Sequence, residues 1–295
     1  MSKDFLADRI KAFVVDLMKS AITRIPYDVY TALKKAYEEE DNPVTKKQLE
    51  TILENIMIAR EEGKPICQDT GTPYFSIEIG EDFPIKSMLY NILADAVREA
   101  TQKIPLRPNA VDPITNTNSG DNTGRFIPWI DAEIVPGSTL KICFMAKGGG
   151  SEYPNVLAMI PPAKGLKGIR EVVLKAVIDA GPKPCPPVII GVGIAAGSDI
   201  ALKLAKKSLY RPVGQRHEIK EVADLEEDLL RLINRLGIGA HGFGGKYTAL
   251  DVKIDYAHRH PASFAVGVVF SCWATRRACG VIDEKGEARL LSRHL

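Results

Sequence analysis

The sequence predicts an α+β (mixed) fold in which helices are concentrated at the front of the chain. The first sixty residues carry apolar side chains at helical spacing. From residue 63 onward, short alternating or continuous apolar runs are separated by turns rich in Gly and Pro, which is typical of strands mixed with helices. The chain shows no repeat of fixed period and no low-complexity segment.

Three helices are predicted in the N-terminal part. Residues 4–22 repeat apolar side chains at the spacing of one helical face. Pro26 suits the first turn of a second helix over 26–40. Pro43 opens a third helix, whose apolar side chains again fall on one face.

The remaining elements alternate between strand and helix patterns. Residues 127–135 and 138–146 are interpreted as paired strands across the turn at Pro136 and Gly137. The other expected elements are strands at 74–79, 188–194, 249–257 and 263–271, helices at 84–103, 166–180, 199–208 and 219–236, and a small hairpin from Val281.

The chain offers no clean domain boundary, because no Gly/Ser/Pro linker separates the helical front from the mixed remainder. We therefore predict one domain over 1–295. Residues 1–62 form its helical N-terminal layer, and 63–295 form its mixed α/β part, which carries the functional site.

Composition and charge narrow the class of protein. Hydrophobic residues make up 45% and charged residues 26%, and 39 Lys and Arg against 37 Asp and Glu leave a net charge of +2. This balance gives no case for nucleic acid or an anionic membrane as a partner. The N-terminus lacks the features of a signal peptide, and the apolar stretch 188–196 is too short to span a bilayer. We expect a cytoplasmic protein.

The five cysteines are Cys67, Cys143, Cys185, Cys272 and Cys279. Because their number is odd and no secretion signal is present, we expect reduced thiols or metal ligation rather than a disulfide framework. No pair forms a CxxC motif, so a local zinc knuckle is not supported.

The loop at 64–73 is the first of four segments suited to chemistry. It places Cys67 beside an amide, a carboxylate and two hydroxyls, in a turn set by Pro65, Gly71 and Pro73 just before a strand. Polar density on a loop held by a strand is typical of a functional site. A plain turn with a buried cysteine is an equally good interpretation of this loop alone.

The other three segments are also loops. Glycines at 148–150 expose backbone N–H groups that suit a carboxylate, although a flexible turn explains them as well. Cys185 lies between prolines ahead of a strand whose glycines suit close backbone packing. His260 precedes Cys272 by twelve residues (272 − 260), and the two meet only if the chain folds back.

An iron–sulfur cluster would account for cysteines on several of these loops, since it needs thiolate ligands. Three protein thiolates leave one of four irons open to bind oxygen atoms as a Lewis acid. Widely spaced single cysteines on Gly- or Pro-containing loops fit this arrangement better than a ferredoxin-type run of cysteines does.

The motifs resemble those of the class I iron–sulfur fumarate hydratases and L-tartrate dehydratases. They occur in the order of that family and span most of the chain. Segments 106–113 and 244–250 are similar to the two-subunit form of these enzymes, as its alpha subunit. The matching motifs are CQDTG at 67–71, NTG at 122–124, AKGGGSE at 146–152, CPP at 185–187 followed by GVGI at 191–194, HPAS at 260–263 and CWA at 272–274.

The resemblance implies a role for each motif. Cys67, Cys185 and Cys272 match the ligands of a [4Fe–4S] cluster. Asp69 and His260 match a pair beside the catalytic base, and such a pair can tune proton transfer. The groups that match substrate-carboxylate contacts are Gln68, Arg107, Gly149 and Gly150.

Cys143 and Cys279 match no ligand and are expected to be structural. Arg276 and Arg277 are interpreted as packing or ion-pair residues rather than substrate contacts.

The resemblance further implies a hydro-lyase that works with a second chain. In one-chain members a C-terminal domain supplies the base, so a separate beta subunit and an α2β2 heterotetramer are expected. The expected reaction is reversible hydration of fumarate to L-malate, a step of the tricarboxylic acid cycle. L-Tartrate dehydration is the alternative within the same chemistry. An iron- or redox-sensing cluster protein is the alternative from another class.

Overall fold

The computed structural model describes residues 2–295, which form two compact units that interleave along the chain. The first unit comprises the residues up to Tyr27, Asn55–Gly148 and Arg276–Leu295. The second comprises Asp28–Glu54 and Gly149–Thr275. The second unit is thus largely an insertion between two segments of the first. The expected grouping into residues 1–62 and 63–295 stays a prediction.

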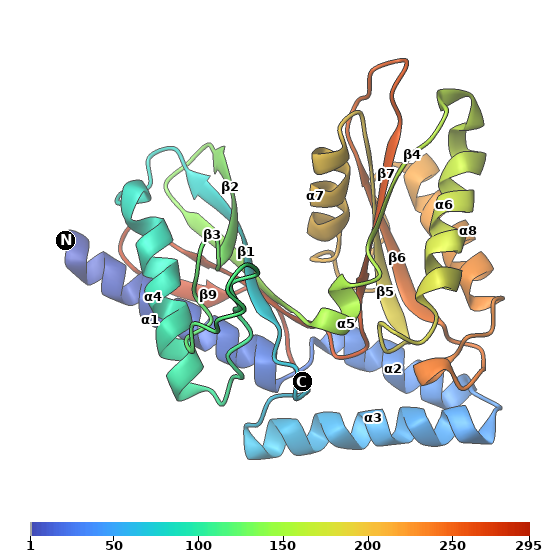
Figure 1. Ribbon diagram of the computed structural model, residues 1–295. Helices are drawn as coiled ribbons and strands as arrows, with labels where there is room; N and C mark the ends of the chain where they lie inside the picture. The colour runs from blue at the N-terminus through green and yellow to red at the C-terminus, as the bar shows by residue number, and fades with distance from the viewer. Residues whose placement is uncertain (1) are drawn as a thin grey trace. The chain divides into compact units, whose positions relative to one another are not determined.

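A five-stranded sheet forms the centre of the first unit (Figure 1). Its strand order is β2-β1-β3-β8-β9. All pairs are antiparallel except β1 with β2, which is parallel. The strands are β1 (Thr72–Gly80), β2 (Trp129–Val135), β3 (Leu140–Lys147), β8 (Arg276–Ile282) and β9 (Ala288–Leu290).

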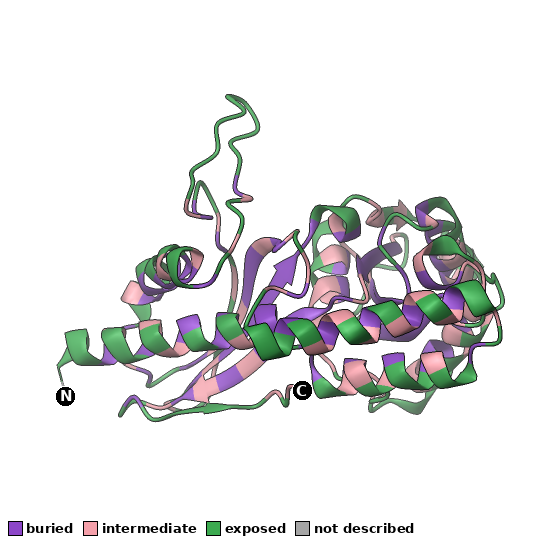
Figure 2. Ribbon diagram, turned by 90° about the horizontal axis from the view of Figure 1, so that it is seen from below, coloured by how far each residue is buried: buried purple, intermediate pink, exposed green. Residues whose placement is uncertain are grey.

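Two helices cover one face of this sheet. They are α1 (Lys3–Thr23) and α4 (Leu89–Lys103), which follows the 3-10 turn η1 (Lys86–Met88). Alternate residues of β1, including Phe75 and Ile77, face them in one hydrophobic core. Figure 2 shows the resulting pattern on α1, which buries one side and exposes the other. This face is the apolar stripe that the sequence predicts for 4–22.

The second unit has a four-stranded sheet in the order β4-β7-β5-β6. The helices α6 and α8 cover one face of this sheet, and α7 covers the other (Figure 1). Its strands are β4 (Val156–Met159), β5 (Val188–Ala195), β6 (Ala249–Tyr256) and β7 (Ala265–Ser271). Its other elements are α2 (Tyr27–Glu39), the first part of α3 (Pro43–Glu62), α5 (Gly149–Glu152), η2 (Pro162–Lys164), α6 (Gly165–Ala180), α7 (Ser198–Ser208), α8 (Lys220–Asn234) and η3 (Ala240–Gly242).

The glycines of β5 let α7 approach the sheet closely. A Cβ atom at Gly193 would lie 1.9 Å from the backbone oxygen of Ala201 in α7, and one at Gly191 would lie 2.1 Å from that of Ala205. No side chain fits at these distances. The structure therefore confirms that these glycines serve close backbone packing.

A buried cluster of charges holds the connection between α7 and α8 against β6. Glu226 and Asp251 are fully buried, and Arg211 and Arg216 each lie 2.6 Å from one of these carboxylates. The Nζ atom of Lys253, also fully buried, lies 2.7 Å from Asp251. Burial lowers the pKa of Lys253, and the neighbouring Asp251 carboxylate opposes this effect. Pairing compensates buried charges that would otherwise be too costly to fold.

The α+β class is confirmed, but one predicted strand pairing is wrong. The strands predicted at 127–135 and 138–146 both exist, yet they do not form a hairpin with each other. Strand β1 lies between them and pairs with both. The short strand β4 and helix α5 were not predicted. No helix within 2–295 has the length and apolar character needed to cross a membrane.

Candidate active site

The Cys67 loop links α3 to β1 in the first unit, and its start is fixed by the backbone. The Ile66 N–H donates to the oxygen of Ile22 at 3.0 Å, and the Asn55 side chain donates to the Ile66 oxygen at 2.9 Å. Cys67 follows as a free, half-buried thiol, and Gln68 beside it is exposed. The loop therefore presents a thiol and an amide from a fixed backbone.

Asp69 is held by its own turn and by a buried arginine. Its Oδ1 accepts a hydrogen bond from Gly71 N at 3.0 Å, which closes an Asx turn. Arg276 is 3% exposed and donates from Nη1 to the Asp69 backbone oxygen. A Cβ atom at Gly148 would lie 2.7 Å from Asp69 Oδ2 and 3.1 Å from Arg276 Nη2. The absence of a side chain at Gly148 therefore leaves room for this pair.

The backbone of Arg107 is tied to the Cys67 loop. The Arg107 N–H donates to Thr70 Oγ1 at 3.1 Å. Asn109 donates from Nδ2 to the Gly71 oxygen at 3.2 Å. The exposed guanidinium of Arg107 is thus carried on a backbone that is fixed beside Asp69.

Asn122 organises the same region from the inside. It is 2% exposed and has a left-handed φ of 61°. Its Oδ1 accepts from Asn109 N at 2.6 Å, and its Nδ2 donates to the Arg107 oxygen at 3.0 Å and to Thr101 Oγ1 at 3.1 Å. Asn is one of the few side chains that tolerate this backbone conformation. The NTG motif therefore supports the Arg107 segment.

Cys185 and Cys272 come together in the second unit. Cys185 is exposed and outside the disulfide. It has a left-handed φ of 51° and follows a turn closed by its N–H to Pro182 O at 3.0 Å. Cys272 is half-buried and also outside the disulfide, immediately after β7. The Trp273 N–H donates to the Cys185 oxygen at 3.3 Å, so the two loops are joined directly.

His260 lies at the other end of β7. It is exposed, in the turn between β6 and β7, and its Nδ1 accepts from Ala262 N at 3.1 Å. This hydrogen bond leaves the proton of the neutral imidazole on Nε2. β7 runs from residue 265 to 271 without folding back, roughly 20 Å at the usual strand rise. Within this unit His260 therefore does not lie with Cys185 and Cys272, and its place in the site stays a prediction.

Gly149 and Gly150 open the short helix α5, and both are exposed. A Cβ atom at Gly150 would lie 3.0 Å from the oxygen of Lys183, two residues before Cys185. Gly150 is thus packed against the Cys185 loop.

Cys143 and Cys279 form a disulfide, which corrects the expectation of reduced thiols for these two residues. They face each other in the register of β3 and β8, with Cα atoms 4.1 Å apart. The sequence gives no sign of this pairing, because it does not show which strands are neighbours. The three cysteines outside this disulfide are Cys67, Cys185 and Cys272.

Comparison with known proteins decides the family. The model of the fumarate hydratase (Fumerase) family matches residues 11–281. The chain belongs to the fumarate hydratase family. Its relatives include "Putative L(+)-tartrate dehydratase subunit alpha" of Methanocaldococcus jannaschii, 44% identical over 92% of this chain and 96% of the relative. L(+)-tartrate dehydratase subunit alpha of Escherichia coli strain UTI89 and that of Shigella sonnei are each 36% identical over 94% of this chain and 91% of the relative.

Membership of the fumarate hydratase family makes the chain a hydro-lyase subunit. It spans nearly the whole length of relatives that are named alpha subunits, so it corresponds to the alpha subunit of the two-subunit form.

The donor set of this fumarate hydratase family member fits an iron–sulfur cluster in its chemistry. Thiolates are the ligands that such a cluster requires, and the three predicted ligands are the cysteines outside the disulfide. Cys185 and Cys272 lie on joined loops of the second unit, and Cys67 belongs to the first unit. Within 2–295 no three His, Cys, Asp or Glu side chains come together as a metal-binding group.

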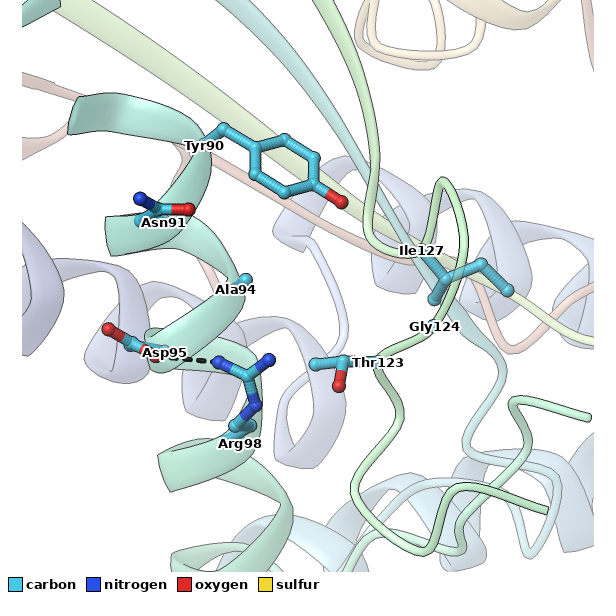
Figure 3. Close-up of a pocket in the computed structure, with 8 residues that line it drawn as sticks. All are labelled: Tyr90, Asn91, Ala94, Asp95, Arg98, Thr123, Gly124 and Ile127. Atoms are coloured by element: carbon cyan, nitrogen blue, oxygen red, sulfur yellow. Dashed lines mark hydrogen bonds and ion pairs between the residues drawn. The ribbon is translucent and has the colours of Figure 1, made fainter. Parts of the chain in front are cut away.

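A pocket of about 510 Å³ lies in the first unit between α4 and residues 123–127 (Figure 3). Tyr90 and Arg98 line its α4 side, where Arg98 is paired with Asp95 at 2.6 Å. None of the predicted site residues lines this pocket. Its cation is already neutralised, so it offers no free charge for a dicarboxylate.

Sequence reasoning missed Arg276, Asn109 and Asn122 as parts of the site. The burial of Arg276 agrees with its interpretation as a packing residue, whereas its contact with Asp69 is new. The only signal in the sequence is a weak one, namely that this arginine follows Cys272 by four residues. The two asparagines lie within motifs that were recognised, yet their bonds to each other depend on folding.

Proposed function

We propose that this chain is the cluster-carrying alpha subunit of a [4Fe–4S]-dependent hydro-lyase that acts on a four-carbon dicarboxylate. The observation that carries the proposal is the agreement between two independent selections of cysteines. The family motifs select Cys67, Cys185 and Cys272 as ligands, and the fold keeps the same three out of the disulfide that joins the other two.

Cys67, Cys185 and Cys272 would hold the cluster through their thiolates. When bound, the cluster supplies an open iron that acts as a Lewis acid toward substrate oxygen atoms. The left-handed backbone at Cys185 and the hydrogen bond from Trp273 N–H to the Cys185 oxygen restrict the positions of the two thiols in the second unit. Such restriction lowers the entropy that is lost when the thiols bind a ligand.

The carboxylates of the substrate would be bound by Gln68, Arg107, Gly149 and Gly150. The exposed guanidinium of Arg107 can form a bidentate pair with a carboxylate, and the exposed amide of Gln68 can donate to one. Two hydrogen bonds fix the Arg107 backbone, from its N–H to Thr70 and from Asn122 to its oxygen. The side chain therefore starts from a defined position.

Asp69 would orient the group that moves the proton, and Arg276 would hold Asp69 in place. His260 is proposed as its partner in proton transfer, with a proton on Nε2 as its hydrogen bond from Ala262 requires.

The partner would be a separate beta subunit that supplies the base, in an α2β2 complex. The names of the relatives support this partner, because they describe alpha subunits.

Fumarate and L-tartrate are the two candidate substrates. The family description favours fumarate, and the names of the relatives favour L(+)-tartrate. Both reactions add or remove water beside a carboxylate, so the residues above serve either one.

The deciding experiment is anaerobic reconstitution of this chain with its beta subunit, followed by iron and sulfide analysis. We expect about four irons per alpha chain. The kcat/KM values for fumarate, L-malate and L-tartrate in the loaded complex then identify the substrate. A loaded complex that turns over none of the three would contradict the proposed reaction. A chain that binds zinc or no metal after anaerobic purification would contradict the proposed cluster.

A further inference from the structure

His241, in the second unit, has a strained backbone conformation. It lies in η3 (Ala240–Gly242) with a φ of 50°, a left-handed conformation that residues other than glycine rarely adopt. Such a conformation costs free energy and persists only where the surroundings enforce it. The position of this side chain therefore calls for an explanation beyond local preference.

The loop around His241 is fixed by the α2–α3 connection and the first turn of α3. Thr45 donates from Oγ1 to the Gly244 oxygen at 2.7 Å, and Glu40 accepts from Lys246 N at 2.9 Å. A Cβ atom at Gly239 would lie 1.6 Å from the Gly244 oxygen, so the two arms of the loop are in direct backbone contact. The surroundings thus enforce the conformation at His241.

The other side of the loop contacts both cysteine loops of the second unit. The His241 N–H donates to the Pro186 oxygen at 2.9 Å, one residue after Cys185. The imidazole lies against the indole of Trp273, with ring centroids 6.5 Å apart, one residue after Cys272. His241 is therefore adjacent to both proposed ligand loops of this unit.

The Nε2 atom of His241 is buried, and no group within 2–295 forms a hydrogen bond with it. Burial lowers the pKa of His241, which keeps the imidazole neutral near pH 7. A buried polar nitrogen without a partner destabilises the fold. A group that binds beside these loops and accepts a hydrogen bond would remove this cost.

We infer that His241 is a positioning residue for the cluster, and that its Nε2–H donates a hydrogen bond to a sulfur atom of the [4Fe–4S] group held by Cys185 and Cys272. This inference rests on the proposed function. Hydrogen bonds to cluster sulfurs stabilise the more negative, reduced state and raise the reduction potential. The partner of Nε2 is then the cluster itself.

The test uses two substitutions in the anaerobically loaded complex. His241→Asn keeps a residue that tolerates a left-handed φ, but its amide is too short to reach the place of Nε2. His241→Gln restores an amide nitrogen at a similar reach. The matched control is His217→Asn, because His217 is also in ring contact in the second unit, with Tyr256 at 6.1 Å, and away from the cysteine loops.

The readouts are the midpoint potential of the cluster and the rate of iron loss in air. We expect His241→Asn to shift the potential to more negative values and to lose iron faster, while His241→Gln and His217→Asn stay close to the wild type. Unchanged potentials in both His241 variants, or equal shifts in both, would overturn the inference. A wild-type complex without a cluster would overturn the proposed function as well, so the two failures are distinguishable.

Discussion

Arg276 illustrates at the residue scale how burial changes the meaning of a charge. An exposed arginine contributes little, but this guanidinium is 3% exposed and bonds to the backbone of Asp69. The sequence shows the residue and its distance from Cys272, and it does not show that β8 returns to the Cys67 loop. Burial and long-range contact are properties of the fold, so the sequence does not predict the contact between Arg276 and Asp69.

The cysteines give the first prediction at this scale. Replacing any one proposed ligand by serine should sharply reduce bound iron and sulfide, because a hydroxyl is a poor ligand for this cluster. The three variants are Cys67→Ser, Cys185→Ser and Cys272→Ser. Cys143→Ser and Cys279→Ser should retain both, since their sulfurs are joined to each other. Iron and sulfide per chain and the visible spectrum after anaerobic reconstitution measure the effect. Equal losses in all five variants would remove the basis of the ligand assignment.

Arg107 gives the second prediction. In Arg107→Met the cluster should remain, while KM for the dicarboxylate rises about 10- to 100-fold, because a hydrogen bond to a charged group is worth roughly 1.5–3 kcal/mol. The loop should keep its position, since its bonds to Thr70 and Asn122 use the backbone. Steady-state kinetics with Arg289→Met as the exposed control separates the effects. Unchanged kinetics would exclude Arg107 from the binding site.

At the scale of elements, periodicity predicted helices well and strand partners poorly. The predicted helix at 4–22 corresponds to α1 (Lys3–Thr23), because an apolar stripe depends on local spacing. Pairing of strands depends on distant segments. The turn at Pro136 and Gly137 suggests a hairpin, yet β1 lies between the two strands it connects. Strand β4 has only four residues, too few for its alternation to stand out.

At the scale of the whole molecule, the chain leaves the first unit after β3 and returns to it at β8. These two strands pair side by side, and the Cys143–Cys279 disulfide joins them across a sequence separation of 136 residues. The disulfide therefore closes the chain around the whole inserted segment 149–275. A cross-link of this length restricts the unfolded chain strongly, on the order of 4–5 kcal/mol as an upper figure.

The last prediction concerns this cross-link. Reduction, or the double substitution Cys143→Ser with Cys279→Ser, should lower the urea midpoint of the first unit and leave the other three cysteines unaffected. The loss in free energy of unfolding should fall below the upper figure if the second unit stays folded, because an ordered insertion already shortens the loop.

The two tryptophans serve as reporters, since Trp129 lies in the first unit and Trp273 in the second. Trp273→Phe and Trp129→Phe backgrounds isolate each signal. The double variant should not respond to reductant. A wild-type midpoint that stays constant while the titrated thiols rise from three to five would show that the disulfide does not stabilise the fold.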